Sequence, residues 1–224
     1  MPLNARRLAG KTSKNSYTIA ASKNLAENYY MTLGITGGMG CGKSTVAGLF
    51  EQRGFLRLDS DVLVREKVLT AADVKTALRA RHGEGVLSKD GTVDRAALGA
   101  RIFADDVERR WLEELVHPRV FTLWREALAS APNARWVVEA PLLFEKALEN
   151  WFDFTVCVAC APGRQLARLE QRGLSRVLAG QRMSKQLPLA QKIELADFVL
   201  WNDGSAAFLG AEVDGLIGAL ARRL

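Results

Sequence analysis

The chain has 224 residues, of which 48% are hydrophobic, so it can bury one sizeable core and carry an inserted subdomain. No apolar run approaches the roughly 20 residues that a membrane-spanning helix needs, so we expect no membrane partner. The formal net charge of +6 is mostly local, because residues 1–30 hold +4 of it and residues 31–224 only +2. This distribution does not indicate nucleic-acid binding by the body of the protein.

Residues 1–30 are polar and show no apolar periodicity, which predicts a disordered extension ahead of a start at Met31. An RNA-binding tail is the alternative, although the aromatic residues of this segment are limited to Tyr17, Tyr29 and Tyr30.

The first chemical motif is the sequence Gly-Gly-Met-Gly-Cys-Gly-Lys-Ser over residues 37–44, which fits the phosphate-binding loop pattern G-x-x-x-x-G-K-[ST]. A short apolar run precedes it and a helical pattern follows it, as the motif requires. Glycines let backbone N–H groups close around phosphate oxygens, Lys43 would reach the β- and γ-phosphates of a nucleoside triphosphate, and the Ser44 hydroxyl would ligate Mg²⁺. The predicted nucleotide-binding residues of the loop are Gly38, Gly40, Cys41, Gly42, Lys43, Ser44 and Thr45.

Short apolar strand candidates alternate with helical patterns along the rest of the chain, which is typical of a parallel α/β sheet. The stretch between the second and third candidates shows only helical patterns and is far longer than a normal crossover, so it predicts a helical insertion. The five predicted strands are Leu33–Thr36, Phe55–Asp59, Arg135–Ala140, Phe154–Ala159 and Phe198–Trp201.

Two carboxylates, Asp59 and Asp61, lie on either side of Ser60 at the carboxyl end of the second predicted strand. One of them can accept the proton of an attacking hydroxyl, and either can help to hold Mg²⁺ through water. We favour Asp61 for this chemistry and leave Asp59 open. The structural alternative is an Asx-turn in which Ser60 or Asp61 caps the next helix.

Glu139 lies at the end of the third predicted strand, where an acidic side chain would face a metal ion. Purely structural hydrogen bonds are a comparable alternative for this residue.

Arginines recur after the fourth predicted strand, and Arg164, Arg168 and Arg172 are spaced by four residues, which places them on one helix face. Such a row near a phosphate site can neutralise charge on a transferring phosphoryl group. We therefore predict a lid function for Arg168 and Arg172, with solvated surface arginines as the alternative.

Three cysteines are a small odd number, which favours a reducing, cytoplasmic setting. Cys157 and Cys160 form a C-x-x-C pair, but the pair overlaps the fourth predicted strand and the chain has no second such pair. We interpret these cysteines as structural rather than zinc-binding or redox-active. The lone His117 and the tryptophans Trp111 and Trp124 are interpreted as packing residues.

The assembled motifs resemble the dephospho-CoA kinase family over essentially all of residues 31–224. The phosphate loop alone is shared by many families, whereas the order of the other blocks is far more specific. These blocks are Asp59-Ser-Asp61, Asp90-Gly91, Arg95-Ala-Ala-Leu98, Ile102-Phe103, Val116-His-Pro118, Ala140-Pro-Leu-Leu-Phe-Glu145, Gln165-Leu-Ala-Arg168, Gln171-Arg172, Gln186-Leu-Pro-Leu-Ala-Gln-Lys192 and Ala196-Asp-Phe-Val-Leu-Trp-Asn-Asp-Gly204.

The resemblance implies the P-loop NTPase fold, with three α/β/α layers around a five-stranded parallel sheet. It implies a nucleotide-binding core over residues 31–61 and 131–224, a helical CoA-binding insertion over residues 62–130, and a helical lid over residues 163–190.

The resemblance also implies transfer of the γ-phosphoryl group of ATP to the ribose 3′-hydroxyl of dephospho-CoA, with Mg²⁺ as cofactor. By match to the family motifs, Asp61 would be the base, Arg168 the lid arginine and Lys43 the holder of the phosphates. We expect a cytoplasmic monomer or weak oligomer.

Three alternatives stay open from the sequence. A nucleoside or nucleotide kinase shares the loop and lid but should not need the long insertion. A GTPase would want an N-K-x-D motif, which this chain lacks. A P-loop adaptor would bind ATP without transferring its phosphoryl group.

Overall fold

The structure is a computed structural model that describes residues 30–223, without the side chains of Phe103 and Ala104. The extension predicted for residues 1–30 therefore lies outside the described residues, apart from Tyr30. The elements, in chain order, are β1 (Met31–Gly37), α1 (Lys43–Glu51), β2 (Leu56–Asp59), α2 (Ser60–Leu63), the π-helical turn η1 (Val64–Val68), α3 (Ala72–His82), the 3₁₀ turn η2 (Glu84–Val86), α4 (Arg95–Ala104), α5 (Asp106–Ser130), β3 (Arg135–Glu139), the 3₁₀ turn η3 (Glu149–Trp151), β4 (Phe154–Ala159), α6 (Pro162–Gln171), α7 (Arg176–Met183), α8 (Leu189–Leu195), β5 (Phe198–Trp201) and α9 (Ala206–Ala221).

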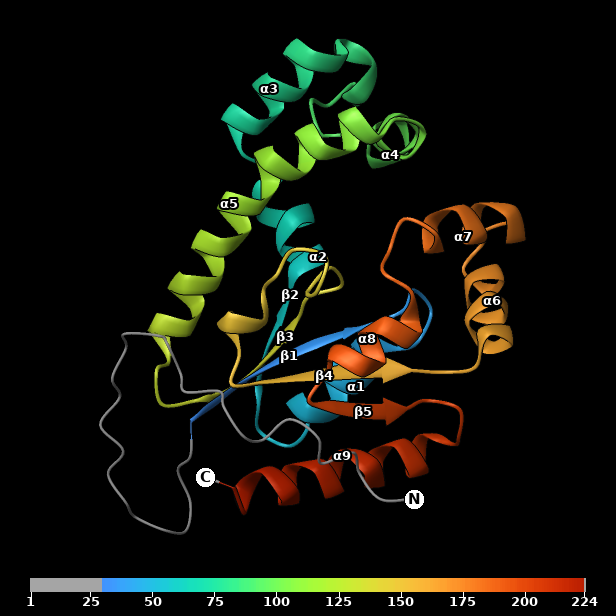
Figure 1. Ribbon diagram of the computed structural model, residues 1–224. Coiled ribbons are helices and arrows are strands. Elements are labelled where there is room, and N and C mark those ends of the chain that lie inside the picture. The colour runs from blue at the N-terminus through green and yellow to red at the C-terminus, as the bar shows by residue number, and fades with distance from the viewer. Residues whose placement is uncertain (1–29, 224) are drawn as a thin grey trace. The chain divides into compact units, whose positions relative to one another are not determined.

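A five-stranded parallel sheet with the strand order β2-β3-β1-β4-β5 forms the centre of the fold (Figure 1). The register pairs Ile35 of β1 with Glu139 of β3 on one side and with Val156 of β4 on the other. All five predicted strands are confirmed, with small shifts at their ends. The largest difference is in the first strand, which was predicted over Leu33–Thr36 but extends from Met31 to Gly37.

Gly34 is a glycine in the middle of β1, within both the predicted and the observed strand. A Cβ atom added at Gly34 would lie 2.5 Å from the Phe152 ring and 2.7 Å from a Leu143 methyl group. The residue is therefore small because neighbouring side chains pack against its backbone, and the strand continues through it.

Helices cover both faces of the sheet, which makes the predicted three-layer arrangement. On the face of Leu33 and Ile35, a buried apolar cluster joins the strands to α1 and α9. The opposite face carries Thr36, whose hydroxyl donates to the carbonyl of Pro141, and α8 packs there against β1 and β4. Figure 1 shows α8 and α9 on opposite sides of the strands.

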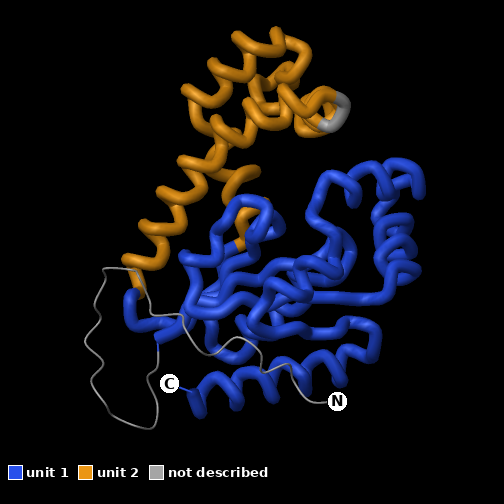
Figure 2. The backbone as a smooth tube through the Cα atoms, viewed as in Figure 1, with its two compact units in different colours: residues 1–58, 132–224 blue, residues 59–131 orange. Residues whose placement is uncertain are grey.

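The chain forms two compact units (Figure 2). Within the described residues, unit 1 comprises 30–58 and 132–223 and contains the sheet, whereas unit 2 comprises 59–131. Helices α2 to α5 make up most of unit 2, together with an isolated antiparallel bridge between Leu87 and Val93. Of the helices in the described part of the chain, none combines the length and apolar character that a membrane span requires.

Aspartate side chains cap the N-termini of α4 and α5 in unit 2. Asp94 accepts hydrogen bonds from two backbone N–H groups at the start of α4, and Asp105 accepts one from Val107 at the start of α5. Helix α5 continues through Pro118, although proline removes one backbone donor from a helix interior.

The aromatic residues of α5 pack inside unit 2. Trp124 is 2% exposed, Trp111 packs edge-on against the His82 ring, and His117 stacks on Phe121. The packing roles predicted for these residues are confirmed.

Candidate active site

The loop between β1 and α1 has the backbone geometry of an anion cradle. Gly40 and Gly42 adopt φ angles of 81° and 93°, a region that side chains with a Cβ atom rarely occupy. A Cβ atom at Gly42 would lie 2.1 Å from the Asn202 amide nitrogen, and one at Gly37 would lie 2.2 Å from the carbonyl oxygen of Val158. The loop therefore requires glycine for two reasons: its backbone turns through positive φ angles, and neighbouring groups pack directly against its backbone.

Lys43 is the first residue of α1 and folds back over the loop. Its ammonium group donates to the carbonyl oxygens of Gly37 and Gly38 at 3.2 and 3.1 Å. The positive end of the nine-residue helix α1 points into the same loop. A cation and a helix N-terminus thus share one small volume, which suits a polyphosphate.

Ser44 and Glu139 meet at the edge of this loop. The Ser44 hydroxyl donates to Glu139 Oε2 at 2.8 Å, although the two residues are 95 positions apart in sequence. The β1–β3 register explains the contact, because it puts Glu139 beside Ile35, whose face of the sheet is covered by α1. Hydroxyl and carboxylate oxygens are the donors that Mg²⁺ prefers, so this pair fits the cation that normally accompanies ATP.

Arg57 of β2 holds the other oxygen of the same carboxylate. Its Nε and Nη2 atoms donate to Glu139 Oε1 at 2.9 and 2.6 Å. Sequence analysis gave no role to Arg57. The sequence feature that could have pointed to Arg57 is its charge within a predicted strand, because a charged side chain there usually has an ion-pair partner.

Helix α6 and the end of β5 brace the loop from the other side. Gln165 donates to the carbonyl of Met39 at 3.0 Å, and Asn202 donates to that of Cys41 at 2.9 Å. Arg168 donates to the Asn202 carbonyl at 2.9 Å and, more weakly, to those of Gly40 and Cys41 at 3.4 Å. The structure thus brings Arg168 to the phosphate loop. The motif blocks contained Gln165 and Asn202, but sequence analysis assigned them no function.

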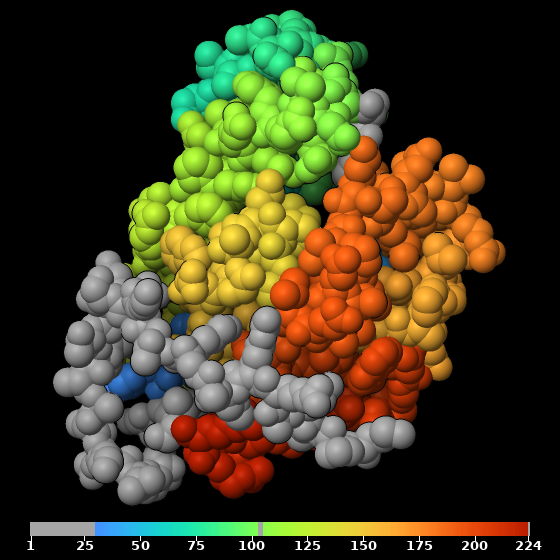
Figure 3. All heavy atoms as spheres, viewed as in Figure 1, coloured from blue at the N-terminus to red at the C-terminus, as the bar shows by residue number. Residues whose placement is uncertain are grey.

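The predicted row of three arginines is less regular than its spacing suggested. Helix α6 ends at Gln171, so Arg172 is its exposed C-cap, and Gly173 with a φ of 82° turns the chain away. Arg164 lies 3.6 Å from Asp203 at the surface. Arg168 therefore differs from its two neighbours, because it is the member of the row that contacts the loop. Figure 3 shows the segment of α6 and α7, in orange, at the surface of unit 1.

Asp59, the last residue of β2, and Asp61, two residues later, lie where unit 2 begins. Asp59 is the N-cap of α2 and accepts a hydrogen bond from the Val62 backbone N–H at 3.0 Å. The structural alternative, in which Ser60 or Asp61 caps this helix, is therefore wrong, because Asp59 at the end of β2 is the cap. Asp61 lies in the first turn of α2 and is exposed.

The three cysteines are free thiols buried around the loop and β4. The Sγ atoms of Cys41 and Cys160 are 3.7 Å apart. Burial raises the pKa of Cys157 and of Cys160 to about 12, and it also raises the pKa of Cys41. Because thiolates are the reactive form, these groups are inert packing elements near neutral pH.

A buried ion pair ties α8 to the loop after β3. The Lys192 side chain is 0% exposed, and its ammonium group lies 2.7 Å from Glu145 Oε1 and donates to the Pro141 carbonyl at 2.8 Å. The backbone N–H of Leu187 donates to the same Glu145 oxygen.

We expect Lys192→Ala to lower the free energy of unfolding by about 3–5 kcal/mol, because the substitution leaves the Glu145 carboxylate without its cation. Urea denaturation should detect the loss. The exposed Lys185→Ala variant is the control and should change the free energy by less than about 0.5 kcal/mol. Equal effects of the two variants would contradict the prediction.

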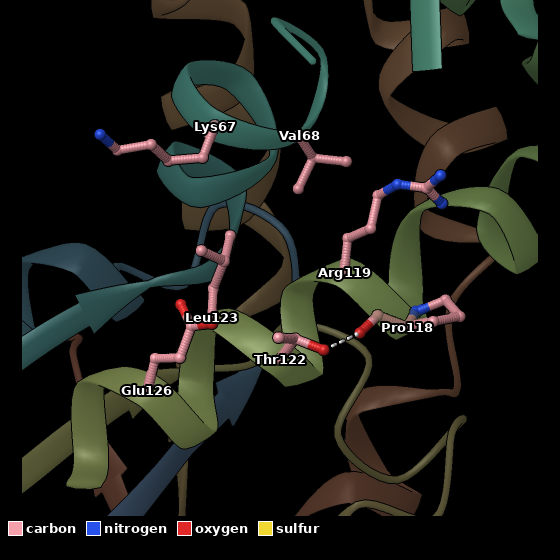
Figure 4. Close-up of a pocket in the computed structure, with 7 residues that line it drawn as sticks. All are labelled: Lys67, Val68, Pro118, Arg119, Thr122, Leu123 and Glu126. Atoms are coloured by element: carbon pink, nitrogen blue, oxygen red, sulfur yellow. Dashed lines mark hydrogen bonds between the residues drawn. The ribbon is translucent and has the colours of Figure 1, made fainter. Parts of the chain in front are cut away.

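Unit 2 has a pocket of about 340 Å³ between η1 and α5 (Figure 4). Its two cations diverge, because the Lys67 side chain points away from the guanidinium of Arg119. Arg119 is bound to Asp73 of α3 and to the Leu115 carbonyl, so it joins two helices of unit 2. We assign no phosphate site to this pocket. Its lining residues are Lys67, Val68, Pro118, Arg119, Thr122, Leu123 and Glu126.

Comparison with known proteins agrees with the chemistry of the loop. The sequence profile of the dephospho-CoA kinase family matches residues 31–207. Dephospho-CoA kinase of Thermosynechococcus vestitus is 45% identical over 194 residues, which cover 86% of this chain and 96% of the relative. That of Geobacillus kaustophilus is 37% identical over 179 residues, which cover 78% and 89%.

Solved structures give the same result. The structure of TT1252 from Thermus thermophilus has a TM-score of 0.74 and 34% identity, and the match covers 86% of this chain and 98% of that one. Dephospho-CoA kinase from Campylobacter jejuni has a TM-score of 0.63 and 26% identity, with 85% and 97% covered. The chain belongs to the dephospho-CoA kinase family.

Proposed function

We propose that the chain transfers the γ-phosphoryl group of ATP to the ribose 3′-hydroxyl of dephospho-CoA, giving coenzyme A and ADP. The observation that carries the proposal is the braced phosphate loop in a chain of this family, with Lys43, Ser44 and Arg168 gathered on it. In the reaction, the 3′-oxygen forms a bond to the γ-phosphorus while the bond to the β–γ bridging oxygen breaks. ADP leaves with that oxygen, and the hydroxyl proton passes to a base.

The loop residues prepare the phosphates for this transfer. Backbone N–H groups of Gly38, Gly40 and Gly42 would face the phosphate oxygens. The N–H of Cys41, between them, donates to the Gly38 carbonyl at 3.2 Å in the structure and would have to leave it to join them, and Thr45 follows in the first turn of α1. Lys43 exchanges its two carbonyl contacts for the β- and γ-phosphates. Ser44, with Glu139 behind it, would hold Mg²⁺, which neutralises phosphate charge when bound.

The acceptor side of the reaction falls to Asp61, which orients the 3′-hydroxyl and takes its proton. We propose that residues 62–130 hold the CoA portion of the acceptor and that residues 163–190 form a lid. Arg172, exposed at the end of α6, would join the nucleotide contacts of that lid.

We further propose a cytoplasmic monomer or weak oligomer that works without nucleic-acid or membrane partners. The three free cysteines support a reducing compartment, because disulfides are rare there.

An assay of phosphoryl transfer tests the function directly. Purified protein with ATP and Mg²⁺ should phosphorylate dephospho-CoA, and nucleosides and nucleotides offered as acceptors should react at least about a hundredfold more slowly. Faster transfer to a nucleoside or nucleotide would favour that class of kinase. ATP binding without transfer to any acceptor would favour the adaptor.

Arg168 should matter mainly in the transition state. Two of its contacts in the free protein are 3.4 Å long and weak, so phosphoryl oxygens can replace them at small cost. We expect Arg168→Ala to lower kcat by at least about tenfold while the Kd for ATP rises less than about threefold. Steady-state kinetics and calorimetry give the two quantities.

Arg164→Ala is the matched control, because Arg164 lies one turn earlier on α6 and pairs with Asp203 instead of the loop. It should change kcat by less than about twofold. A loss in Arg168→Ala that is confined to ATP affinity would assign Arg168 to ground-state binding.

A further inference from the structure

The two oxygens of the Glu139 carboxylate have different partners. Oε2 accepts a hydrogen bond from the Ser44 hydroxyl at 2.8 Å, while Oε1 accepts two from Arg57, at 2.9 and 2.6 Å. Glu139 is 3% exposed, so its carboxylate depends on these partners rather than on bulk water. The Nε and Nη2 donors of Arg57 share the oxygen Oε1, whereas the second oxygen, Oε2, faces Ser44.

Arg57 is placed for this contact by the sheet. It lies on β2, the neighbour of β3, and is 82 positions from Glu139 in sequence. Its side chain is 25% exposed, and another carboxylate, that of Glu51, is 3.8 Å away and more exposed. The guanidinium therefore pairs more closely with Glu139 than with Glu51. Its planar fork fixes the direction of that carboxylate as well as balancing its charge.

The orientation of Glu139 decides what the Ser44 hydroxyl can do. Since the hydroxyl proton is donated to Glu139, the lone pairs of Ser44 Oγ remain available to a cation. Ser44 is exposed, so a ligand can reach that oxygen. If the carboxylate rotated, Ser44 would lose its acceptor and the hydroxyl proton could turn toward the cation site.

We infer that Arg57 is a positioning residue for the Mg²⁺–nucleotide site: it acts through Glu139 to keep the Ser44 oxygen free for the cation. This inference rests on the proposed function for the role of Ser44 toward Mg²⁺. It extends that function by a residue outside the phosphate loop. Groups that orient metal ligands in this way typically contribute 10- to 100-fold to metal affinity or activity.

Calorimetry of ADP binding, with and without Mg²⁺, separates positioning from simple stabilisation. In Arg57→Met, we expect the strengthening of ADP affinity by Mg²⁺ to fall by about tenfold, with ADP affinity in the absence of Mg²⁺ unchanged within about twofold. Arg57→Lys keeps the charge but not the fork, so it should recover part of the Mg²⁺ effect. Thermal melting of each variant reports its stability separately.

Arg53→Met is the matched control. The Arg53 side chain is 24% exposed and also pairs with a carboxylate, but its partner is Asp214 on α9. This variant should keep the full effect of Mg²⁺ on ADP affinity, even if its melting temperature falls.

The inference is overturned if Arg57→Met keeps the Mg²⁺ effect, or if it loses ADP affinity equally with and without the cation. It is also overturned if Arg53→Met loses the effect to the same extent. Because dephospho-CoA is absent from this experiment, a chain that binds Mg²⁺–ADP as expected but fails to phosphorylate dephospho-CoA would count against the proposed function alone.

Discussion

Lys43→Met is expected to lower phosphoryl transfer from ATP by roughly a thousandfold, the upper end of the loss when one donor to a developing oxyanion is removed. The Lys43 ammonium group is the cation at the start of α1, and the glycine cradle offers backbone dipoles but no second full charge there. Methionine keeps much of the side-chain stem, so the packing of the loop changes little. The effect should therefore fall on turnover rather than on folding.

Initial rates with saturating ATP and dephospho-CoA measure this loss, and a thermal melt checks the fold. Arg53→Met serves again as the control, because it removes a cation just beyond the other end of α1. Its turnover should stay within about twofold of the unmodified protein. Near-normal turnover in Lys43→Met would refute the assignment of the loop.

The sheet could be predicted from sequence because buried parallel strands are short continuous apolar runs between turn signals. Strands β4 and β5 begin and end at the predicted residues. The phosphate loop was equally accessible, since all its residues are local in sequence and their spacing encodes the geometry. What the sequence left open was how close Gly34 stands to Phe152, because that contact depends on the packing of the chain after β3.

The support around the loop could not be predicted, because it depends on strand order. The contact between Arg57 and Glu139 exists because β2 and β3 are neighbours in the sheet. The sequence around either residue does not reveal which strands will be neighbours. The braces from Gln165 and Asn202 likewise join the loop to α6 and to the end of β5. Their residue types did not predict these contacts, since side-chain amides cap helices or lie at the surface as readily as they bond to a loop backbone.

The cap of α2 illustrates a different limit. Three polar residues in a row, from Asp59 to Asp61, can each serve as an N-cap, and the end of β2 decides between them. Since Asp59 takes that role, the carboxylate of Asp61 is not needed to begin the helix. This separation makes the role of Asp61 testable without disturbing the fold.

Asp61→Asn is expected to reduce turnover by at least about a hundredfold, the lower end of what a positioned general base contributes. Asparagine has nearly the same shape and can still orient a hydroxyl, but it cannot take the proton. The loss of one charge from the first turn of α2 costs about 0.3–1 kcal/mol at most, so the protein should stay folded. Calorimetry should find the affinities for ATP and dephospho-CoA changed by less than about threefold, because the effect is on the reacting hydroxyl.

Asp59→Asn is the matched comparison, because it makes the same chemical change two residues earlier. Asparagine caps helices as well as aspartate does, so this variant should fold normally and keep its turnover within a few-fold. If Asp61→Asn keeps normal turnover while the turnover of Asp59→Asn falls about a hundredfold, the base is Asp59. Asp59 would then both cap α2 and take part in the reaction. If both variants lose turnover together with their melting temperature, the segment is structural and proton transfer must be assigned to another group.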